Sequence, residues 1–207
     1  SVDLKELEKR YRFLNIEVAN KYFEDNRDII LALSHYGNWE WGSQISSRVF
    51  RHSLMAFYKP LSNGMVDRYI ENNRAKRFIK LISIDKPRLP ARGKGSPPMA
   101  YLFISDQNTS SLKAHWVNFL NQDTPCHRGM EVYARQYNLP VIYVDVQRVK
   151  RGYYTVELEE LIPDPLHTAP GEITERYMQK LEKIIVQKPE NWLWSHRRWK
   201  RTRQVTA

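Results

Sequence analysis

Short apolar runs alternate with longer segments of helical periodicity along this chain, and the alternation predicts an α/β domain. Apolar residues spaced three or four apart predict a helix over residues 2–14, and similar spacing predicts a second helix over 16–23. Apolar runs of five or six residues that end at polar or turn-forming residues predict strands. These runs occupy residues 28–33, 53–58, 80–84 and 99–104.

Helical periodicity returns between and after these strands. The further predicted helices cover residues 38–49, 62–78, 128–137 and 171–187, with Asn38 and Ser62 as N-caps of the first two. Two β-type runs, 140–149 and 153–161, flank Arg151-Gly152 and predict a hairpin, whereas the Pro- and Gly-rich segment 85–98 predicts a loop. The whole pattern predicts one α/β domain over residues 1–207, with a largely parallel or mixed central sheet flanked by helices.

Composition narrows the class of protein. A chain of 207 residues with 42% hydrophobic residues is long enough to bury one sizeable core, and it is too short for two full-sized domains. Its single cysteine, Cys126, excludes an intramolecular disulfide and a cysteine-based zinc site. No apolar run approaches the roughly 18 residues that cross a bilayer, and the start SVDLKELEKR is not a signal peptide.

The net charge of +10 is concentrated in two segments. Residues 48–95 carry an excess of nine positive charges and residues 191–207 an excess of five, whereas the rest of the chain is slightly acidic. Such patches favour partners that carry phosphate, namely nucleic acid, anionic lipid headgroups or a phosphorylated carrier. A basic surface that is merely solvated is the alternative.

His35 is the first candidate for chemistry, because it directly follows an apolar strand, and functional loops gather at strand ends in α/β sheets. Glu40 lies five residues further on, in the first turn of the predicted helix. A carboxylate there is expected to fix the tautomer of the imidazole, while the other ring nitrogen takes a proton from a substrate hydroxyl. A histidine that only makes a hydrogen bond within its loop is the alternative.

The string Ser34–Gly42, SHYGNWEWG, resembles the signature of the bacterial lipid A biosynthesis acyltransferases, the lauroyl and myristoyl transferases related to the glycerolipid acyltransferase superfamily. Three later blocks strengthen the resemblance, so that together the four blocks cover residues 28–200. The three blocks are FYKPLSN (57–63, with Asp67 and Arg68), ISDQ (104–107) and PENWLWSHRRWK (189–200).

The resemblance implies a glycerolipid-acyltransferase-like fold and assigns roles to individual residues. His35 becomes the general base and Glu40 its partner, while Asp106 matches an aspartate that supports the site. Arg74, with Arg77 as the rival for the same position, is expected near a substrate phosphate. Lys59 and Asn63 are expected to shape the site.

The resemblance also implies the reaction. We expect transfer of a fatty acyl group from an acyl carrier protein or coenzyme A thioester to a hydroxyl of a lipid A precursor, without metal or another cofactor, at the cytoplasmic face of the bacterial inner membrane. Family members commonly begin with a hydrophobic anchor, so an N-terminal membrane-anchoring segment is expected to be absent from this chain. A lysophospholipid, aminolipid or mannoside acceptor is an alternative, and so is a non-catalytic protein that binds anionic lipid or nucleic acid.

The C-terminal run interleaves indoles with cations, a pattern that is typical of membrane interfaces. The residues expected to contact the membrane are Trp192, Trp194, Arg197, Arg198 and Trp199. The alternative is that these tryptophans pack under the domain. No recognised nucleic-acid motif accompanies the pattern, which argues against a nucleic-acid partner.

Overall fold

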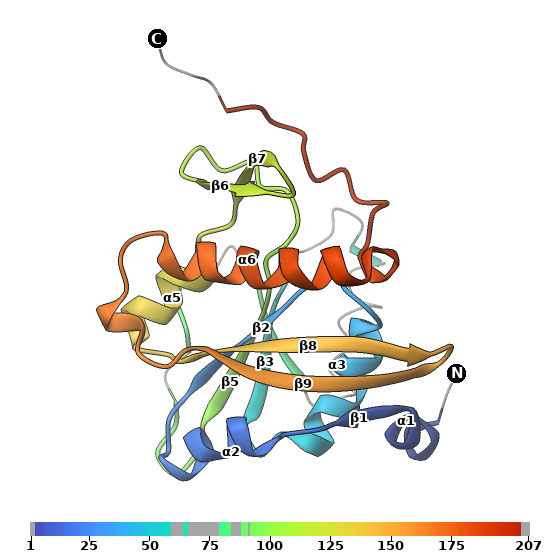
Figure 1. The fold of residues 1–207 in the computed structure, drawn as a ribbon. Coiled ribbons are helices and arrows are strands. Elements are labelled where there is room, and N and C mark those ends of the chain that lie inside the picture. The colour runs from blue at the N-terminus through green and yellow to red at the C-terminus, as the bar shows by residue number, and fades with distance from the viewer. Residues whose placement is uncertain (1–2, 59–63, 66–78, 84–87, 91, 204–207) are drawn as a thin grey trace.

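The fold is drawn in Figure 1 from a computed structural model, which describes residues 3–58, 64–65, 79–83, 88–90 and 92–203. The helices are α1 (Leu4–Arg10), α2 (Glu17–Glu24), α3 (Trp39–Val49), α5 (Gly129–Tyr137), α6 (Glu172–Gln187) and the 3-10 turns η1 (Pro165–His167) and η2 (Pro189–Asn191). The strands are β1 (Tyr11–Phe13), β2 (Ile29–Leu33), β3 (Ser53–Tyr58), β4 (Ile79–Ser83), β5 (Met99–Ile104), β6 (His115–Phe119), β7 (Gln122–Cys126), β8 (Val141–Lys150) and β9 (Tyr153–Ile162).

Seven of these strands form one mixed sheet in the order β1-β9-β8-β2-β5-β3-β4. Each neighbouring pair is parallel except β8 and β9, which form an antiparallel hairpin. β6 and β7 form a separate two-stranded hairpin. The largely parallel, mixed sheet predicted from the sequence is therefore confirmed.

Helices cover both faces of the sheet (Figure 1), and the sequence of β2 shows why. Ile29 and Leu31 point into one core with side chains of α1, α2 and α3, while Ile30 and Ala32 point into the other with side chains of α5 and α6. Successive strand residues face opposite sides, so a strand that is buried on both faces is apolar throughout. The short run IILAL therefore marks the centre of the sheet.

Most of the predicted elements are present. The strands over 53–58 and 99–104 occur with the predicted bounds, the β8–β9 hairpin turns at Arg151-Gly152, and the Asn38 side chain caps α3 by accepting a hydrogen bond from Trp41 N. The strand predicted over 80–84 is observed as Ile79–Ser83. The helix predicted over 62–78 lies mostly outside the described residues.

Two elements differ from the sequence prediction. The first helix ends at Arg10 rather than running to residue 14, because Tyr11–Phe13 pairs with β9 as the edge strand β1. The β6–β7 hairpin was not predicted. Its turn residues Leu120 and Asn121 both have positive φ, and an Asn in such a turn was the available signal.

The β8–β9 hairpin extends well beyond the end of β2. Tyr143 pairs with Ala32 near the end of β2, whereas β8 continues to Lys150, which places the hairpin tip roughly 20 Å past the end of β2. Because β8 and β2 are parallel, the tip lies at the edge of the sheet where β2 and β5 end, next to β1, which pairs with β9 at Tyr154–Val156.

A buried carboxylate joins α5 to the start of α6. Glu131, 2% exposed, accepts hydrogen bonds from Gly171 N at 2.6 Å, Thr174 N at 3.1 Å and Thr174 Oγ1 at 2.8 Å. It thereby pairs N–H groups that the first turn of α6 leaves free and places a negative charge at the positive end of the helix.

We expect Glu131→Ala to lower the free energy of unfolding by about 2–4 kcal/mol, because charged hydrogen bonds are lost and buried donors are left unpaired. Urea unfolding followed by circular dichroism measures the change. Glu157→Gln, an exposed change on β9, is the control and should stay within about 0.5 kcal/mol of the original chain. A similar loss in both variants would contradict a capping role for Glu131.

Candidate active site

The candidate site lies where β2 and β5 end side by side. Leu33 and Ile104, the last residues of these parallel strands, are register partners, so His35 and Asp106 each lie two residues beyond the same edge of the sheet. From β2 the chain continues to β3 on the far side of β5, and from β5 its next strand in this sheet is β8, on the far side of β2. Such a reversal of strand order opens a crevice in which α/β proteins bind their ligands.

Asp106 binds His35 through two contacts, one to the imidazole and one to the backbone N–H. Its Oδ1 lies 2.7 Å from His35 Nδ1, and its Oδ2 accepts a hydrogen bond from His35 N at 3.0 Å. The His35 ring also makes an edge contact with Trp39, with 5.0 Å between ring centroids. The His35 side chain is 18% exposed and that of Asp106 only 2%, so solvent reaches the histidine but hardly reaches its partner.

The surroundings of Asp106 favour its ionised form. Burial on its own would raise the pKa of this carboxyl, but hydrogen bonds from the His35 ring, the Trp192 indole and the His35 backbone outweigh burial and hold the pKa below its ordinary value. An ionised carboxylate accepts the proton of Nδ1. This leaves Nε2 with a lone pair that can take a proton from a substrate.

The segment after η2 closes the other side of the His35 loop. Residues 35–37 and 191–193 lie antiparallel: Gly37 N donates to Asn191 O at 2.9 Å, and Leu193 N donates to His35 O at 3.0 Å. Between these two contacts the Trp192 indole donates to Asp106 Oδ2 at 3.0 Å. The C-terminal block is thus part of the structure that fixes His35.

Gly37 is required by this packing. Its φ is +63°, and a Cβ at this position would lie 2.8 Å from Val146 O and 2.9 Å from Val146 Cγ1 on β8. Only glycine combines that backbone conformation with so close an approach. The turn between His35 and α3 is therefore pressed against the central sheet.

The prediction that Glu40 holds His35 needs correction. The two ring nitrogens of His35 lie against Asp106 and Gln107, and Glu40 is exposed in the first turn of α3. The carboxylate on Nδ1 comes from the neighbouring parallel strand rather than from the following helix. A catalytic part for Glu40 stays a prediction.

The predicted membrane contacts divide into two groups. Trp192 is 7% exposed and Arg198 is 1% exposed, so the expectation that these two contact a membrane is wrong. Trp192 binds Asp106, and Arg198 donates to Pro125 O at 2.8 Å inside the core. Trp199 is partly buried and donates to Thr124 Oγ1, whereas Trp194, 51% exposed, and Arg197 lie at the surface.

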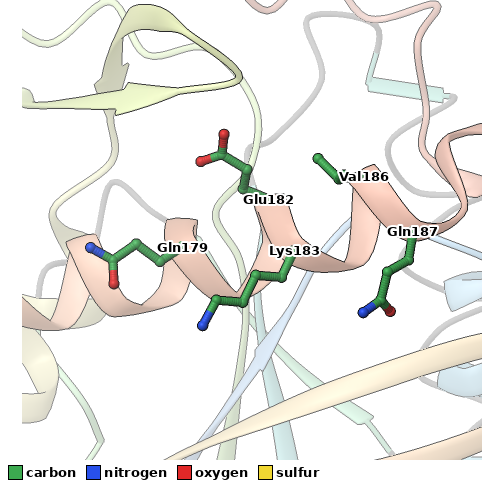
Figure 2. A pocket seen from close by; sticks show the side chains of 5 residues that line it. All are labelled: Gln179, Glu182, Lys183, Val186 and Gln187. Carbon is green, nitrogen blue, oxygen red and sulfur yellow. The ribbon is translucent and has the colours of Figure 1, made fainter.

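Four predicted site residues, Lys59, Asn63, Arg74 and Arg77, lie outside the described residues, so their roles stay predictions. Two hollows in the described surface lie away from His35. Figure 2 shows the first, lined by side chains of α6 alone, and the second lies at the opposite edge of the sheet around Asp28 and Tyr101. Within the described part of the chain, no cluster of three or more His, Cys, Asp or Glu residues is arranged to hold a metal ion.

Sequence reasoning missed two functional contacts of this site. Gln107, next to Asp106, places its side-chain nitrogen 3.3 Å from His35 Nε2. Trp192 was expected at a membrane and instead binds Asp106. Both residues belong to blocks that resemble the family, and this resemblance was the sequence signal that could have assigned them to the site.

A histidine held by a buried carboxylate at the switch point of an α/β sheet has the geometry that a general base needs to activate a hydroxyl. The family model described as bacterial lipid A biosynthesis acyltransferase matches residues 2–201. The chain belongs to this family, and it is an acyltransferase of the lipid A type. A comparison with curated proteins found no match.

Proposed function

We propose that the chain transfers a fatty acyl group from an acyl thioester to a hydroxyl of a lipid A precursor, with His35 as the general base. The observation that carries the proposal is the 2.7 Å contact between His35 Nδ1 and the buried carboxylate of Asp106, on a ring that solvent still reaches. This contact directs Nε2, the nitrogen with the lone pair, to the substrate.

The proposed reaction needs no redox step. Nε2 takes the proton of the acceptor hydroxyl as the oxygen attacks the thioester carbonyl, and the electron pair of the C=O bond moves to its oxygen. The tetrahedral intermediate then re-forms the carbonyl and breaks the C–S bond. The imidazolium returns its proton to the leaving thiolate, so an ester and a thiol are the products. Asp106 stabilises the imidazolium between these two steps.

The thioester donor is proposed to be acyl carrier protein or coenzyme A, and no metal or other cofactor enters the proposal. Both donors are anionic, which agrees with the nine excess positive charges of residues 48–95. Arg74 or Arg77 is proposed to meet the phosphate, with Lys59 and Asn63 shaping the site. A lysophospholipid, aminolipid or mannoside is the alternative acceptor.

We place the reaction at the cytoplasmic face of the inner membrane, with an anionic lipid surface as partner. In the described part of the chain, no helix has the length and apolar character of a membrane span. The tip of the β8–β9 hairpin offers a different means of attachment. It carries Arg148, Lys150 and Arg151 beside Val149, which is 64% exposed, and Lys150 lies 4.3 Å above the Tyr153 ring. The tip lies at the same edge of the sheet as His35.

We expect the chain to bind anionic vesicles more strongly than neutral ones, with binding that weakens as salt increases. Each cation near an anionic surface contributes about 1 kcal/mol, so changing Arg148, Lys150 and Arg151 together to glutamine should lower the association constant at least about tenfold. Changing the exposed tail cations Arg197, Lys200 and Arg203 tests the C-terminal segment in the same way. Vesicle co-sedimentation provides the measurement.

The matched control removes three exposed cations from the opposite edge of the sheet, namely Arg51, Arg88 and Lys94. These residues precede β3 and β5, so they face away from the edge that holds His35. The control should bind like the original chain. Equal losses in all three triple variants would mean that net charge alone determines binding, and equal sedimentation with neutral and anionic vesicles would refute the lipid surface as partner.

The experiment that tests the proposed function is mass spectrometry of lipid A and total lipid from a strain lacking this chain, complemented with the original sequence or with His35→Ala. We expect the deletion to lack one acyl chain on lipid A, restored only by the original sequence. An unchanged lipid A together with a changed phospholipid or aminolipid would mean that the acceptor is that lipid and not a lipid A precursor. Full complementation by His35→Ala would favour a non-catalytic lipid-binding protein instead.

A further inference from the structure

A carboxamide lies against the ring nitrogen that the proposed reaction uses. Gln107 follows Asp106 in the loop after β5, and its Nε2 lies 3.3 Å from His35 Nε2. Asp106 lies 2.7 Å from the other ring nitrogen, Nδ1. Two consecutive residues therefore contact the two nitrogens of one imidazole, the first with an acceptor and the second with a donor.

The roles of these atoms follow from the ionised Asp106. Because the carboxylate accepts the Nδ1 proton, His35 Nε2 carries the lone pair, and the amide of Gln107 donates to it. An acceptor hydroxyl must take this place before its proton can move to Nε2. When it does, the amide is released from the base but remains beside the reacting oxygen.

We propose that Gln107 is a catalytic residue that donates a hydrogen bond to the oxyanion of the tetrahedral intermediate; this inference rests on the proposed function. The attacking oxygen lies within about 2.8 Å of Nε2 when its proton is transferred. The oxyanion is bonded to the same carbon as the attacking oxygen, so it forms close to that oxygen and therefore also close to Nε2. A donor 3.3 Å from Nε2 is within reach of that position.

Four other N–H groups near His35 are already used by the fold. His35 N and the Trp192 indole donate to Asp106, Gly37 N donates to Asn191 O, and Trp41 N donates to Asn38 Oδ1. These four hydrogen bonds hold the His35 loop. Their donors cannot bind a substrate unless the bonds break and the loop changes its conformation. The amide of Gln107, by contrast, loses only its contact with His35 Nε2, and the hydroxyl of the substrate takes its place on that nitrogen.

The side chain of Gln107 is also placed for a role in the reaction rather than in the core. It is partly exposed, as His35 is, while Asp106 beneath it is buried. Its backbone is positioned by β5, one of the central strands of the sheet. A donor fixed in this way before the charge develops costs little reorganisation in the transition state.

The test measures steady-state kinetics of purified variants with an acyl-coenzyme A and a lipid A precursor. Gln107→Ala is expected to lower kcat by about 10² to 10³ with little change in KM and an unchanged thermal midpoint. Gln107→Glu, which replaces the donor with a carboxylate, is expected to be no more active than Gln107→Ala at neutral and alkaline pH, where the carboxylate is ionised. Gln136→Ala, an exposed change on α5, is the matched control and should retain full activity.

The Gln107→Glu variant separates an oxyanion donor from a residue that only orients the ring. A carboxylate beside Nε2 binds the protonated ring and stabilises the imidazolium, so a purely orienting role predicts a pH profile shifted to higher pH, with substantial activity at alkaline pH. Either that result, or a kcat within about threefold of the original for Gln107→Ala, would overturn the proposal. If His35→Ala is inactive while Gln107→Ala is normal, only this inference fails. If the original chain transfers no acyl group, both proposals fail together.

Discussion

Replacing His35 with alanine is expected to lower the rate of acyl transfer at least about a hundredfold while the chain remains folded. The ring supplies the base for the hydroxyl proton and the acid for the leaving thiolate, so its loss removes proton transfer in both directions. Its packing contribution is small, because the side chain is partly exposed and its main contacts are the bonds to Asp106 and the edge contact with Trp39. Release of free thiol, with the lipid product followed by mass spectrometry, measures the change.

His167→Ala is the matched control for this variant. His167 lies in η1, its side chain is 83% exposed, and it pairs with Asp164 at the surface. Its removal should change neither the activity nor the thermal midpoint. Turnover near the original rate in a folded His35→Ala protein would exclude His35 as the base, and the reaction would then need another residue to activate the hydroxyl.

Local patterns in the sequence placed His35 correctly at the end of a central strand. The run IILAL marks a strand that is buried on both faces, and the small and polar residues after it mark the point where that strand ends. The Asn38 cap then fixes the start of α3. Each of these features depends on neighbours within a few residues, which is the range over which hydrophobic periodicity and capping act.

The partner of His35 depends on contacts that are distant in sequence. Glu40 was the nearest carboxylate along the chain, but Asp106, 71 residues away, is placed beside the ring by the parallel pairing of β2 with β5. Sequence spacing does not specify which strands become neighbours, and here β5 lies between two strands that precede it in the chain. The resemblance to the family assigned Asp106 to the site without saying what it contacts.

The C-terminal tail shows a second limit of pattern reasoning. Indoles interleaved with cations are typical of a membrane interface, but the same side chains also suit a buried polar site. Trp192 has a donor that Asp106 requires, and Arg198 extends into the core to Pro125 O. Trp192 and Arg198 are therefore buried, whereas Trp194 and Arg197 lie at the surface.

Asp106→Asn is expected to lower kcat by about 10² to 10⁴ and also to change how stability depends on pH. The amide cannot accept the Nδ1 proton as a carboxylate does, so the tautomer with the lone pair on Nε2 loses its support. It also cannot stabilise the imidazolium. Kinetics with the same thioester and acceptor test the first expectation, and urea unfolding at several pH values tests the second.

The sign of the pH effect follows from the lowered pKa of Asp106. A carboxyl that is more acidic in the folded state contributes stability above its unfolded pKa of about 3.9, and this contribution is lost as pH falls through the folded value. Asp106→Asn should therefore be clearly less stable than the original chain at pH 7, and the difference should narrow at pH 3 and below.

Asp145→Asn provides a control of opposite sign. Burial raises the pKa of the Asp145 carboxyl despite the hydrogen bond from Gln147, so its charge opposes folding at neutral pH. This variant should be at least as stable as the original chain at pH 7, and its stability should approach that of the original chain as pH falls.

A pH-independent loss of stability in Asp106→Asn would show that the Asp106 carboxylate acts through packing alone. An unchanged kcat in Asp106→Asn would show that Asp106 has no part in catalysis, and His35 would then have to act without a charged partner.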